Sequence, residues 1–174
     1  MARVFVGVGS NIDPAGHVEQ AVRLLGTAAH IRAISTVYLT EAVGSSGQPP
    51  YYNCVVELDT ETPPVELKQQ VLRRIEKELG RVRSSDAYAA RTIDLDLLLY
   101  DQVVMTTVDL TLPDPDIVQR PFLAIPLLEL DPGLKLPGSG LLISEIASAL
   151  PRDAMQPLHD YTEQLRKGML HERK

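Results

Sequence analysis

Hydrophobic residues recur along the chain with two different periods, and the points where the period changes predict its elements. A β-rich run over residues 3–8 ends in Gly7-Val8-Gly9-Ser10-Asn11, which is typical of a strand that enters a turn. Asp13-Pro14 then predicts a helix start, with Asp13 at the cap and proline in the first helical position. Apolar residues follow at helical spacing until Gly26, which predicts the helix end.

Two further strands are predicted from short apolar runs. The runs over residues 31–39 and 53–58 contain β-branched residues and are bounded by polar segments. The segment 40–52 between them is rich in glycine, serine and proline, so we expect a loop there.

The next helix has clear start and stop signals. Thr62 is the expected cap, Pro63 fits the first helical position and Gly80 fits the end. A stripe of apolar residues at every fourth position predicts the buried face of this helix: Leu67, Val71, Ile75 and Leu79.

The rest of the chain predicts one more strand and several short elements. A polar loop over 81–90 precedes a strand over 92–100. The remaining predicted elements are an extended segment at 110–113, short helices at 121–130 and 142–150, and a charged helical tail at 159–174.

The predicted order of elements is β-α-β-β-α-β with additions at the C-terminal end. This order is the split βαβ, or ferredoxin-like, pattern of an α+β fold, in which helices pack on an antiparallel sheet. A chain of 174 residues suits one domain, which we expect over 1–158, with the tail at 159–174. Proteins of unrelated function share this fold, so function has to be argued from a site.

Composition and charge narrow the possible functions. Hydrophobic residues make up 44% and charged residues 23%, which excludes a disordered or fibrous chain. The net charge of −6 argues against a protein that grips a nucleic-acid backbone. A single cysteine, Cys54, excludes an internal disulfide. Apolar runs stay below the ~20 residues of a membrane helix, and no signal-peptide pattern is present, so we expect a cytoplasmic protein.

Asp94-Leu95-Asp96 is the most informative unit for chemistry. Residues two apart on a strand point to the same face, about 6.6–6.8 Å apart. Two carboxylates at this spacing resist burial unless a cation compensates them, and such oxygen ligands suit magnesium. On the pair alone, the solvated face of an edge strand is the commoner explanation. The flanking apolar residues predict a buried opposite face: Ile93, Leu95, Leu97 and Leu99.

Three arginines, Arg81, Arg83 and Arg91, precede the carboxylate pair. Guanidinium groups bind phosphate oxygens through two parallel hydrogen bonds. An arginine-bearing loop that leads into a metal-binding carboxylate pair suits phosphoryl transfer, because both groups neutralise charge on the moving oxygens. Ordinary salt bridges, for instance to Glu76 or Glu78, are the alternative, and the two interpretations weigh equally at this point.

Other nucleotide-binding motifs are absent from the sequence. Gly7-Val8-Gly9 fails the dinucleotide fingerprint because Ile12 stands where the third glycine belongs, and no P-loop pattern exists. We therefore expect these glycines to permit a tight turn or close backbone packing.

The end of the 40–52 loop carries Tyr51, Tyr52 and Asn53. An aromatic ring can stack on a flat ligand, and an amide both donates and accepts hydrogen bonds. Taken alone, closure of the core by the tyrosines and capping of a turn by Asn53 is the commoner use. Phe122, taken alone, favours a core position.

Taken together, these residues resemble the 6-hydroxymethyl-7,8-dihydropterin pyrophosphokinases, the 2-amino-4-hydroxy-6-hydroxymethyldihydropteridine diphosphokinase family of folate biosynthesis. The resemblance runs from Val4 to about Ile146. The motifs that carry it are Gly9-Ser10-Asn11, Tyr51-Tyr52-Asn53, Gly80-Arg81-Val82-Arg83, Arg91-Thr92-Ile93-Asp94-Leu95-Asp96, and Leu112-Pro113 followed by Arg120-Pro121-Phe122. Ordered matches over most of the chain argue against a chance similarity.

The resemblance implies transfer of a pyrophosphoryl group from ATP to the hydroxymethyl group of the reduced pterin, with release of AMP. It implies that Asp94 and Asp96 hold two Mg²⁺ ions and that Arg81 and Arg91 act with them in catalysis. Implied ATP contacts are Glu76, Arg83, Arg91, Leu97, Thr111 and Arg120. Implied pterin contacts are Thr40, Val43, Tyr51, Asn53, Asp94 and Phe122. We accordingly expect a monomer that binds two small molecules, and neither nucleic acid nor a membrane.

The chain departs from the family pattern at Asp114, where a histidine is usual, and at Ala87, where a basic residue is common. Two other functions remain open on the residues. One is an RNA-binding module of the same fold, although the acidic charge and the lack of an aromatic-basic strand motif speak against it. The other is a magnesium-dependent phosphodiesterase or nucleotidyl enzyme that uses the same carboxylates.

Overall fold

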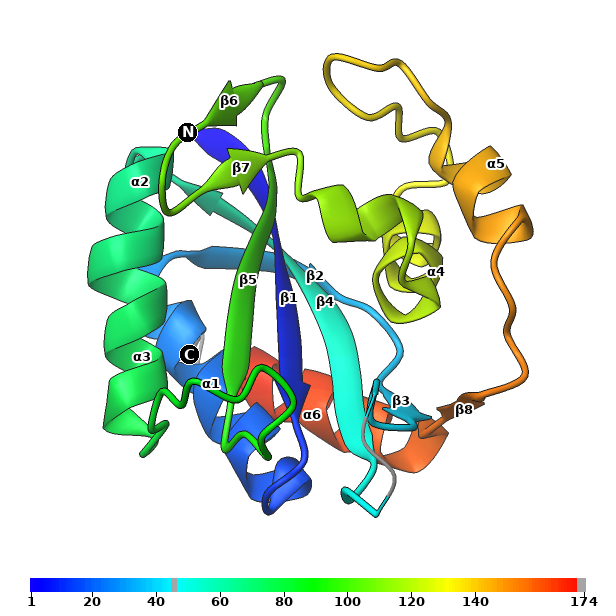
Figure 1. Ribbon diagram of the computed structural model, residues 1–174. Helices are drawn as coiled ribbons and strands as arrows, with labels where there is room; N and C mark the ends of the chain where they lie inside the picture. Colours follow the sequence, from blue (N-terminus) through cyan, green and yellow to red (C-terminus); the bar gives the residue numbers. More distant parts are fainter. Residues whose placement is uncertain (45–46, 172–174) are drawn as a thin grey trace.

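The computed structural model describes residues 1–44 and 47–171 and has a six-stranded antiparallel sheet at its centre (Figure 1). Neighbouring strands follow the order β5-β1-β4-β3-β8, and β2 pairs with the other end of β4. This order confirms the predicted ferredoxin-like pattern. The strands are β1 (Ala2–Ser10), β2 (His30–Ile34), β3 (Tyr38–Thr40), β4 (Tyr51–Thr60), β5 (Asp94–Tyr100) and β8 (Met155–Pro157).

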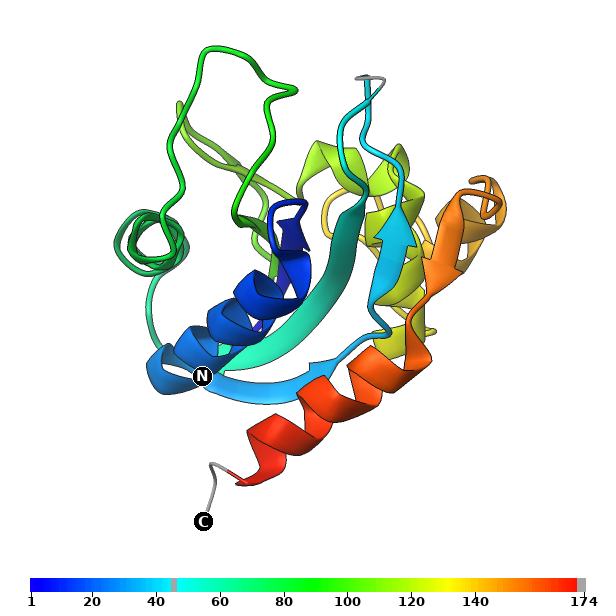
Figure 2. The same cartoon turned by 90° about the horizontal axis from the view of Figure 1, so that it is seen from below.

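Helices cover both faces of the sheet (Figure 2). One apolar cluster lies between the sheet and the helices α1, η1, α3 and α6, and a second lies between the sheet and α4 and α5. None of the described helices is long and apolar enough to cross a membrane. The helices are α1 (Pro14–Ala28), α2 (Pro64–Glu66), the π-helical η1 (Leu67–Leu72), α3 (Arg73–Glu78), the 3₁₀ turn η2 (Pro115–Val118), α4 (Pro121–Leu130), α5 (Ile143–Ser148) and α6 (His159–His171).

The register of three neighbouring strands determines where the polar residues of interest meet. Gly9 of β1 pairs with Asn53 of β4 on one side and with Asp94 of β5 on the other. Asp96 lies opposite Gly7, two residues earlier on β1. A Cβ atom at Gly9 would lie 2.6 Å from the side-chain oxygen of Asn53, so the close packing predicted for this glycine is confirmed. One end of the sheet thereby collects an amide and two carboxylates.

The single strand predicted over 31–39 is wrong, because the chain leaves the sheet between β2 and β3. The N–H of Thr36 donates to the Glu129 carboxylate at 3.0 Å, and the N–H of Val37 donates to the Thr162 hydroxyl at 2.9 Å. These side chains satisfy backbone groups that a continuous strand would pair with its neighbour. The acceptors lie 93 and 125 residues away in sequence, so the local pattern does not reveal the break.

Helix boundaries differ from the predicted ones by a few residues. The first helix continues past Gly26 to Ala28, and the second begins at Pro64 rather than after Thr62. Gly26 is a packing residue, since a Cβ atom there would lie 2.8 Å from a methyl group of α6. The predicted end at Gly80 is confirmed by its φ of 84°.

The second helix contains a π-helical turn that the sequence does not announce. The N–H of Arg73 donates to the carbonyl of Lys68, five residues earlier. The wider turn shifts the apolar stripe, so Leu72 is fully buried whereas the predicted Val71 is only half-buried.

A β-bulge in β5 divides its apolar residues between the two faces of the sheet. Leu97 pairs with Val6 and Leu99 pairs with Phe5, which leaves Leu98 as the extra residue. Leu95 and Leu97 pack in one cluster, whereas Leu98 and Leu99 pack in the other. The prediction that Leu99 shares a face with Leu95 and Leu97 is therefore wrong.

The later part of the chain is close to its prediction. The helices expected at 121–130 and 142–150 correspond to α4 and α5, and the extended 110–113 segment contributes β7 (Thr111–Leu112) to a hairpin with β6 (Met105–Thr106). β8 was not predicted. The expected helical tail forms α6, whose Leu165 packs into the core. Residues 45–46 of the predicted loop and 172–174 of the tail lie outside the described residues.

Cys54 provides a test of this packing. Its thiol is buried in β4, and burial raises the pKa of the thiol to about 12. Because the thiolate is the reactive form, we expect the native protein at mildly alkaline pH to react with a thiol reagent at least roughly a hundredfold more slowly than the protein unfolded in guanidinium chloride. Equal rates in the two states would show that this part of the sheet is open to solvent.

Candidate active site

A cavity of about 500 Å³ lies at the end of the sheet where β1 finishes and β4 and β5 begin. Its volume is typical of small-molecule sites. Segments from β1 to α4, far apart in sequence, form its wall. Twelve of the fourteen predicted site residues line it: Thr40, Val43, Tyr51, Asn53, Glu76, Arg81, Arg83, Arg91, Asp94, Asp96, Arg120 and Phe122.

The other two predicted residues, Leu97 and Thr111, lie outside the cavity wall. The side chain of Leu97 is buried in the apolar cluster beneath β5, because neighbouring residues of a strand point to opposite faces. Thr111 is exposed on β7. Their contacts with a nucleotide stay predictions.

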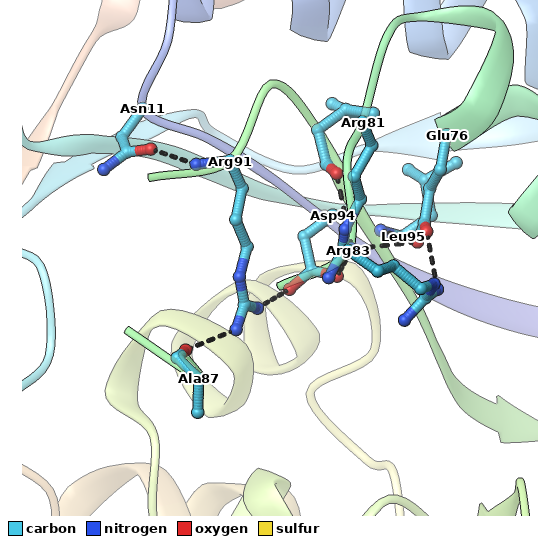
Figure 3. Close-up of polar contacts among 9 residues, drawn as sticks. Asn11, Glu76, Arg81, Arg83, Ala87, Arg91, Asp94 and Leu95 are labelled. Carbon is cyan, nitrogen blue, oxygen red and sulfur yellow. Dashed lines mark hydrogen bonds and ion pairs between the residues drawn. The ribbon is translucent and has the colours of Figure 1, made fainter. Parts of the chain in front are cut away.

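Asp94 is held by two arginines that flank the loop before β5 (Figure 3). Arg81 Nη1 donates to one carboxylate oxygen at 2.5 Å, and Arg91 Nη1 donates to the other at 2.6 Å. Arg91 Nη2 also donates to the carbonyl of Ala87 at 2.6 Å. Each oxygen of Asp94 therefore accepts a hydrogen bond from one arginine, and all three residues line the cavity.

Glu76 of α3 contacts Arg81 and Arg83 at the wall of the same cavity. Glu76 is 4% exposed, and its carboxylate accepts hydrogen bonds from the N–H of Leu95 at 3.1 Å and from Arg83 at 2.9 Å (Figure 3). Arg81 lies 3.2 Å from the same carboxylate. Burial raises the pKa of Glu76, and the Leu95 N–H and Arg81 partly offset this. Burial lowers the pKa of Arg81, but Asp94 and Glu76 outweigh it and raise that pKa.

The end of α3 explains how Arg81 reaches β5. Gly80 adopts the left-handed conformation, and the N–H of Arg81 donates back to the carbonyl of Glu76 at 3.0 Å. This is the hydrogen bond of a Schellman end, which turns the chain sharply after the helix. The arginine that follows the glycine is thereby directed across to the carboxylates.

Asp94 and Asp96 fit a magnesium site. Burial raises the pKa of Asp96 well above its ordinary value, and repulsion from Asp94, Asp114 and Glu76 adds to the effect. A divalent cation would compensate these charges. Among the described residues, no group of three or more His, Cys, Asp or Glu side chains is placed to hold an ion. Magnesium suits such a pair, since it often takes one or two carboxylates together with water and substrate phosphates.

The part of the wall formed by β3 and β4 carries an oriented amide. Asn53 Nδ2 donates to the Thr40 hydroxyl at 2.7 Å, and both residues are buried. Tyr51 and Phe122 contribute aromatic rings to the wall. Burial raises the pKa of Tyr51, so its hydroxyl stays protonated at neutral pH. A fixed amide and aromatic rings together suit a flat heteroaromatic ligand.

Comparison with known proteins identifies the family. Residues 5–132 match the 7,8-dihydro-6-hydroxymethylpterin-pyrophosphokinase (HPPK) family. The chain is 34% identical over 145 residues to the 2-amino-4-hydroxy-6-hydroxymethyldihydropteridine pyrophosphokinase of Haemophilus influenzae, a match that covers 82% of this chain and 89% of that protein. The Pseudomonas aeruginosa protein of the same name is 33% identical over 159 residues, covering 90% and 96%. The chain belongs to the HPPK family.

Solved structures of HPPK-DHPS proteins share the fold. The crystal structure of Plasmodium falciparum HPPK-DHPS with SDX-DHP superimposes on 90% of this chain with a TM-score of 0.68 at 12% identity. The chain spans 47% of that longer protein. The likeness agrees with the α+β, ferredoxin-like fold predicted from the order of elements.

Sequence reasoning missed two basic residues of this HPPK-family site. Lys68 and Arg73 line the cavity, and Asp109 holds both. Lys68 Nζ donates to the Asp109 carbonyl at 2.5 Å, and the Arg73 guanidinium lies 3.7 Å from the Asp109 carboxylate. Residues five apart diverge on a regular α-helix, but the π-helical turn brings them to one side. The sequence offers only the basic character of this helix as a signal.

Asp114, at the position where the resemblance implies a histidine, caps the turn η2. Its Oδ1 accepts the N–H of Asp116 at 2.8 Å. Asp116, rather than Asp114, lines the cavity. Burial raises the pKa of Asp114, and the hydrogen bond from Asp116 partly offsets this. The aspartate therefore has a local structural role as a cap.

Asn11 connects the turn after β1 to two loops of the cavity wall. Its Oδ1 accepts the N–H of Arg91 at 2.8 Å (Figure 3). Its own backbone N–H donates to the Arg91 carbonyl at 3.2 Å. Its Nδ2 donates to the Pro49 carbonyl at 3.2 Å and to the Gln48 side chain at 3.4 Å. The residue is 3% exposed. The buried amide of Asn11 thus holds two segments together: Arg91, in the loop before β5, and the end of the 41–50 loop.

We expect Asn11→Ala to lower the free energy of unfolding by about 1–3 kcal/mol, because it removes the hydrogen bonds that a buried amide makes to the backbone of half-buried Arg91 and to the Pro49 carbonyl. Displacement of Arg91 should also lower kcat. Asn11→Asp keeps the acceptor for Arg91 and should retain more kcat than the alanine variant. Thermal unfolding and steady-state rates test this, with Gln48→Ala as the control that removes only the weakest bond. Equal behaviour of Asn11→Ala and Gln48→Ala would contradict the assignment.

Proposed function

We propose that this chain transfers the pyrophosphoryl group of ATP to 6-hydroxymethyl-7,8-dihydropterin and releases AMP. The hydroxymethyl oxygen forms a bond to the β-phosphorus, the bond from that phosphorus to the α-phosphate oxygen breaks, and the hydroxyl proton leaves to solvent. Family membership and the activity named for the relatives support this reaction. The observation that carries it is a carboxylate pair, an arginine cluster and an oriented amide in one cavity.

The charge of the cavity supports a polyphosphate ligand. Among the described residues, six basic and five acidic side chains line it, whereas the whole chain carries a net charge of −6. In this proposal Arg81 and Arg91 stabilise negative charge on the transferred group, because guanidinium groups bind phosphate oxygens through paired hydrogen bonds. The other nucleotide contacts we propose are Glu76, Arg83, Leu97, Thr111 and Arg120.

Asp94 and Asp96 hold two Mg²⁺ ions in this proposal. Bound magnesium neutralises charge along the triphosphate. The two carboxylates begin β5 two residues apart, so one strand face presents both to the cavity. Burial, together with repulsion from Asp94, raises the pKa of Asp96, and a cation at this position would compensate the negative charge.

The pterin side of the proposal rests on Asn53. Because Thr40 holds Asn53 Nδ2, the amide orientation is fixed before a ligand arrives. In the proposal this amide bonds the edge of the pterin, Tyr51 and Phe122 sandwich its ring, and Val43 and Asp94 complete the pocket.

The decisive experiment measures AMP formed from ATP and magnesium with and without the hydroxymethyl pterin. We expect AMP only when the pterin is present, in a 1:1 ratio to the pterin diphosphate. AMP formation from ATP alone would instead support the runner-up, a hydrolytic or nucleotidyl enzyme that uses the same carboxylates. A pterin that lacks the hydroxyl group is the control, because it can bind but offers no acceptor oxygen.

We also propose that the chain acts as a cytoplasmic monomer on these two small molecules and binds no nucleic acid, with residues 1–158 as the catalytic domain and 159–174 as the tail. The buried free thiol of Cys54 is consistent with a reducing compartment. The net charge of −6 argues against nucleic-acid binding. Sedimentation at a mass near 19.2 kDa would support the monomer, and a dimer would contradict it.

A further inference from the structure

Both oxygens of Asp94, a proposed magnesium ligand, are occupied by arginines of the same chain. Arg81 donates to one oxygen and Arg91 to the other, at 2.5 and 2.6 Å. The side chains of Asp94 and Arg81 are 19% and 11% exposed, so this pair is shielded from most of the solvent. Charge-assisted hydrogen bonds with little solvent around them are strong. A cation that approaches Asp94 therefore competes with two guanidinium groups for its oxygens, each of which already accepts one hydrogen bond.

The protein provides few ligands for a free cation that would compensate the loss of these hydrogen bonds. Within the described residues, no third His, Cys, Asp or Glu joins the carboxylates to form a complete ligand set. The unmoved Arg81 and Arg91 would also repel an incoming ion from a few ångströms away. Magnesium ordinarily completes such a shell with water and substrate phosphates. Metal binding therefore depends on whether Arg81 and Arg91 leave Asp94 and on whether substrate phosphates are present to complete the ligand shell.

A bound polyphosphate gives both arginines alternative acceptors to Asp94. Its oxygens offer guanidinium groups the same paired geometry as a carboxylate, with more negative charge. Each arginine also keeps a second acceptor after it leaves Asp94. Arg81 lies 3.2 Å from Glu76, and Arg91 donates to the Ala87 carbonyl at 2.6 Å. Neither guanidinium group is therefore left without an acceptor when it releases Asp94.

We propose that Arg81 and Arg91 close the metal site to free divalent cations, and that the site takes the metal only together with the polyphosphate that draws the arginines away. This inference rests on the proposed nucleotide-dependent function, and it adds which form of the ligand the site accepts. Asp94 thereby has two successive partners, the arginine pair in the free protein and the metal in the loaded one.

The test measures Mn²⁺ binding to the nucleotide-free protein from the electron paramagnetic resonance signal of unbound Mn²⁺. We expect weak binding by the unaltered chain and a gain of about tenfold or more for Arg81→Ala and for Arg91→Ala, with a larger gain for the double variant. Arg83→Ala is the matched control, because Arg83 belongs to the same loop and cavity but bonds Glu76 instead of Asp94. Arg74→Ala, on the exposed side of α3, is the second control.

Three outcomes overturn the proposal. An equal gain for Arg83→Ala and Arg81→Ala would show a general effect of charge rather than occupation of Asp94. Tight Mn²⁺ binding by the unaltered chain, or no gain in any variant that retains its native circular dichroism, would also contradict it. Asp96→Asn in the double variant should remove the gain, and its failure to do so would place the ion elsewhere.

A second arm separates this inference from the proposed function. A non-hydrolysable ATP analogue should raise the Mn²⁺ affinity of the unaltered chain by a larger factor than that of the double variant, whose site is already open. If the analogue does not bind at all, the proposed function fails, while the nucleotide-free comparison still decides whether the arginines close the site. Equal factors in the two proteins would contradict the inference even if the analogue binds.

Discussion

Replacing Asp96 with asparagine is expected to abolish pyrophosphoryl transfer and, at the same time, to raise the stability of the protein. Asparagine keeps the shape of the side chain but lacks the charge of a magnesium ligand. The change also removes the repulsion that Asp94, Asp114 and Glu76 exert on this half-buried carboxylate. At neutral pH we expect the melting temperature to rise by roughly 2–4 °C, which corresponds to about 1 kcal/mol for a chain of this size.

Asp94→Asn is the matched comparison, because it removes the same charge two residues away. It should abolish activity as well, but it breaks the ion pairs with Arg81 and Arg91, so the free energy of unfolding should fall by about 1–3 kcal/mol. An AMP assay and thermal unfolding in one buffer measure both quantities. Near-full activity of either variant would contradict the metal assignment. A loss of stability in Asp96→Asn would contradict the account of repulsion.

The carboxylate pair was predictable from sequence because strand geometry is local. Residues two apart on a strand share a face wherever the strand lies, so Asp94 and Asp96 could be placed together before the fold was known. Gly80 was equally readable, because a glycine after an apolar helical stripe marks a helix end by its own backbone freedom. The βαββαβ order followed from such local signals.

Contacts between distant segments account for most of what the sequence could not show. The break between β2 and β3 depends on acceptors from Glu129 and Thr162, which belong to helices placed there by the tertiary fold. Asn11 is part of the Gly9-Ser10-Asn11 motif, but its role depends on where the fold places the 41–50 loop and Arg91. Neither partner follows from the residues around it.

Interruptions of the regular helix and strand repeats account for the other features that the sequence did not predict. The π-helical turn places Lys68 and Arg73 on the cavity wall, and the β-bulge moves Leu99 to the other face of the sheet. Both features insert one residue into a repeating pattern, so a prediction that assumes a constant period is correct before the insertion and shifted after it. The basic residues missed at the site lie at such an insertion.

Arg81→Ala and Arg91→Ala are expected to lower kcat on the order of 10²–10³-fold, which is the usual loss when one preorganised electrostatic donor is removed. The reason lies in when the charge develops. Negative charge on the transferred group is greatest in the transition state, so groups that contact its oxygens affect the transfer step more than ground-state binding. Pterin affinity should change little, because Asn53 and Thr40 hold their geometry without either arginine.

Single-turnover rates and pterin titrations on the same variants measure the two effects separately. Arg83→Ala is the control, since its side chain is 59% exposed and bonds Glu76 rather than Asp94, and we expect it to lose less rate than the other two. Arg81→Lys should fall between the alanine variant and the unaltered chain, because lysine keeps the charge but loses the paired donors. Equal losses in rate and in pterin affinity would mean that Arg81 and Arg91 only shape the cavity, because a residue that acts on the transition state must affect the transfer step more than binding.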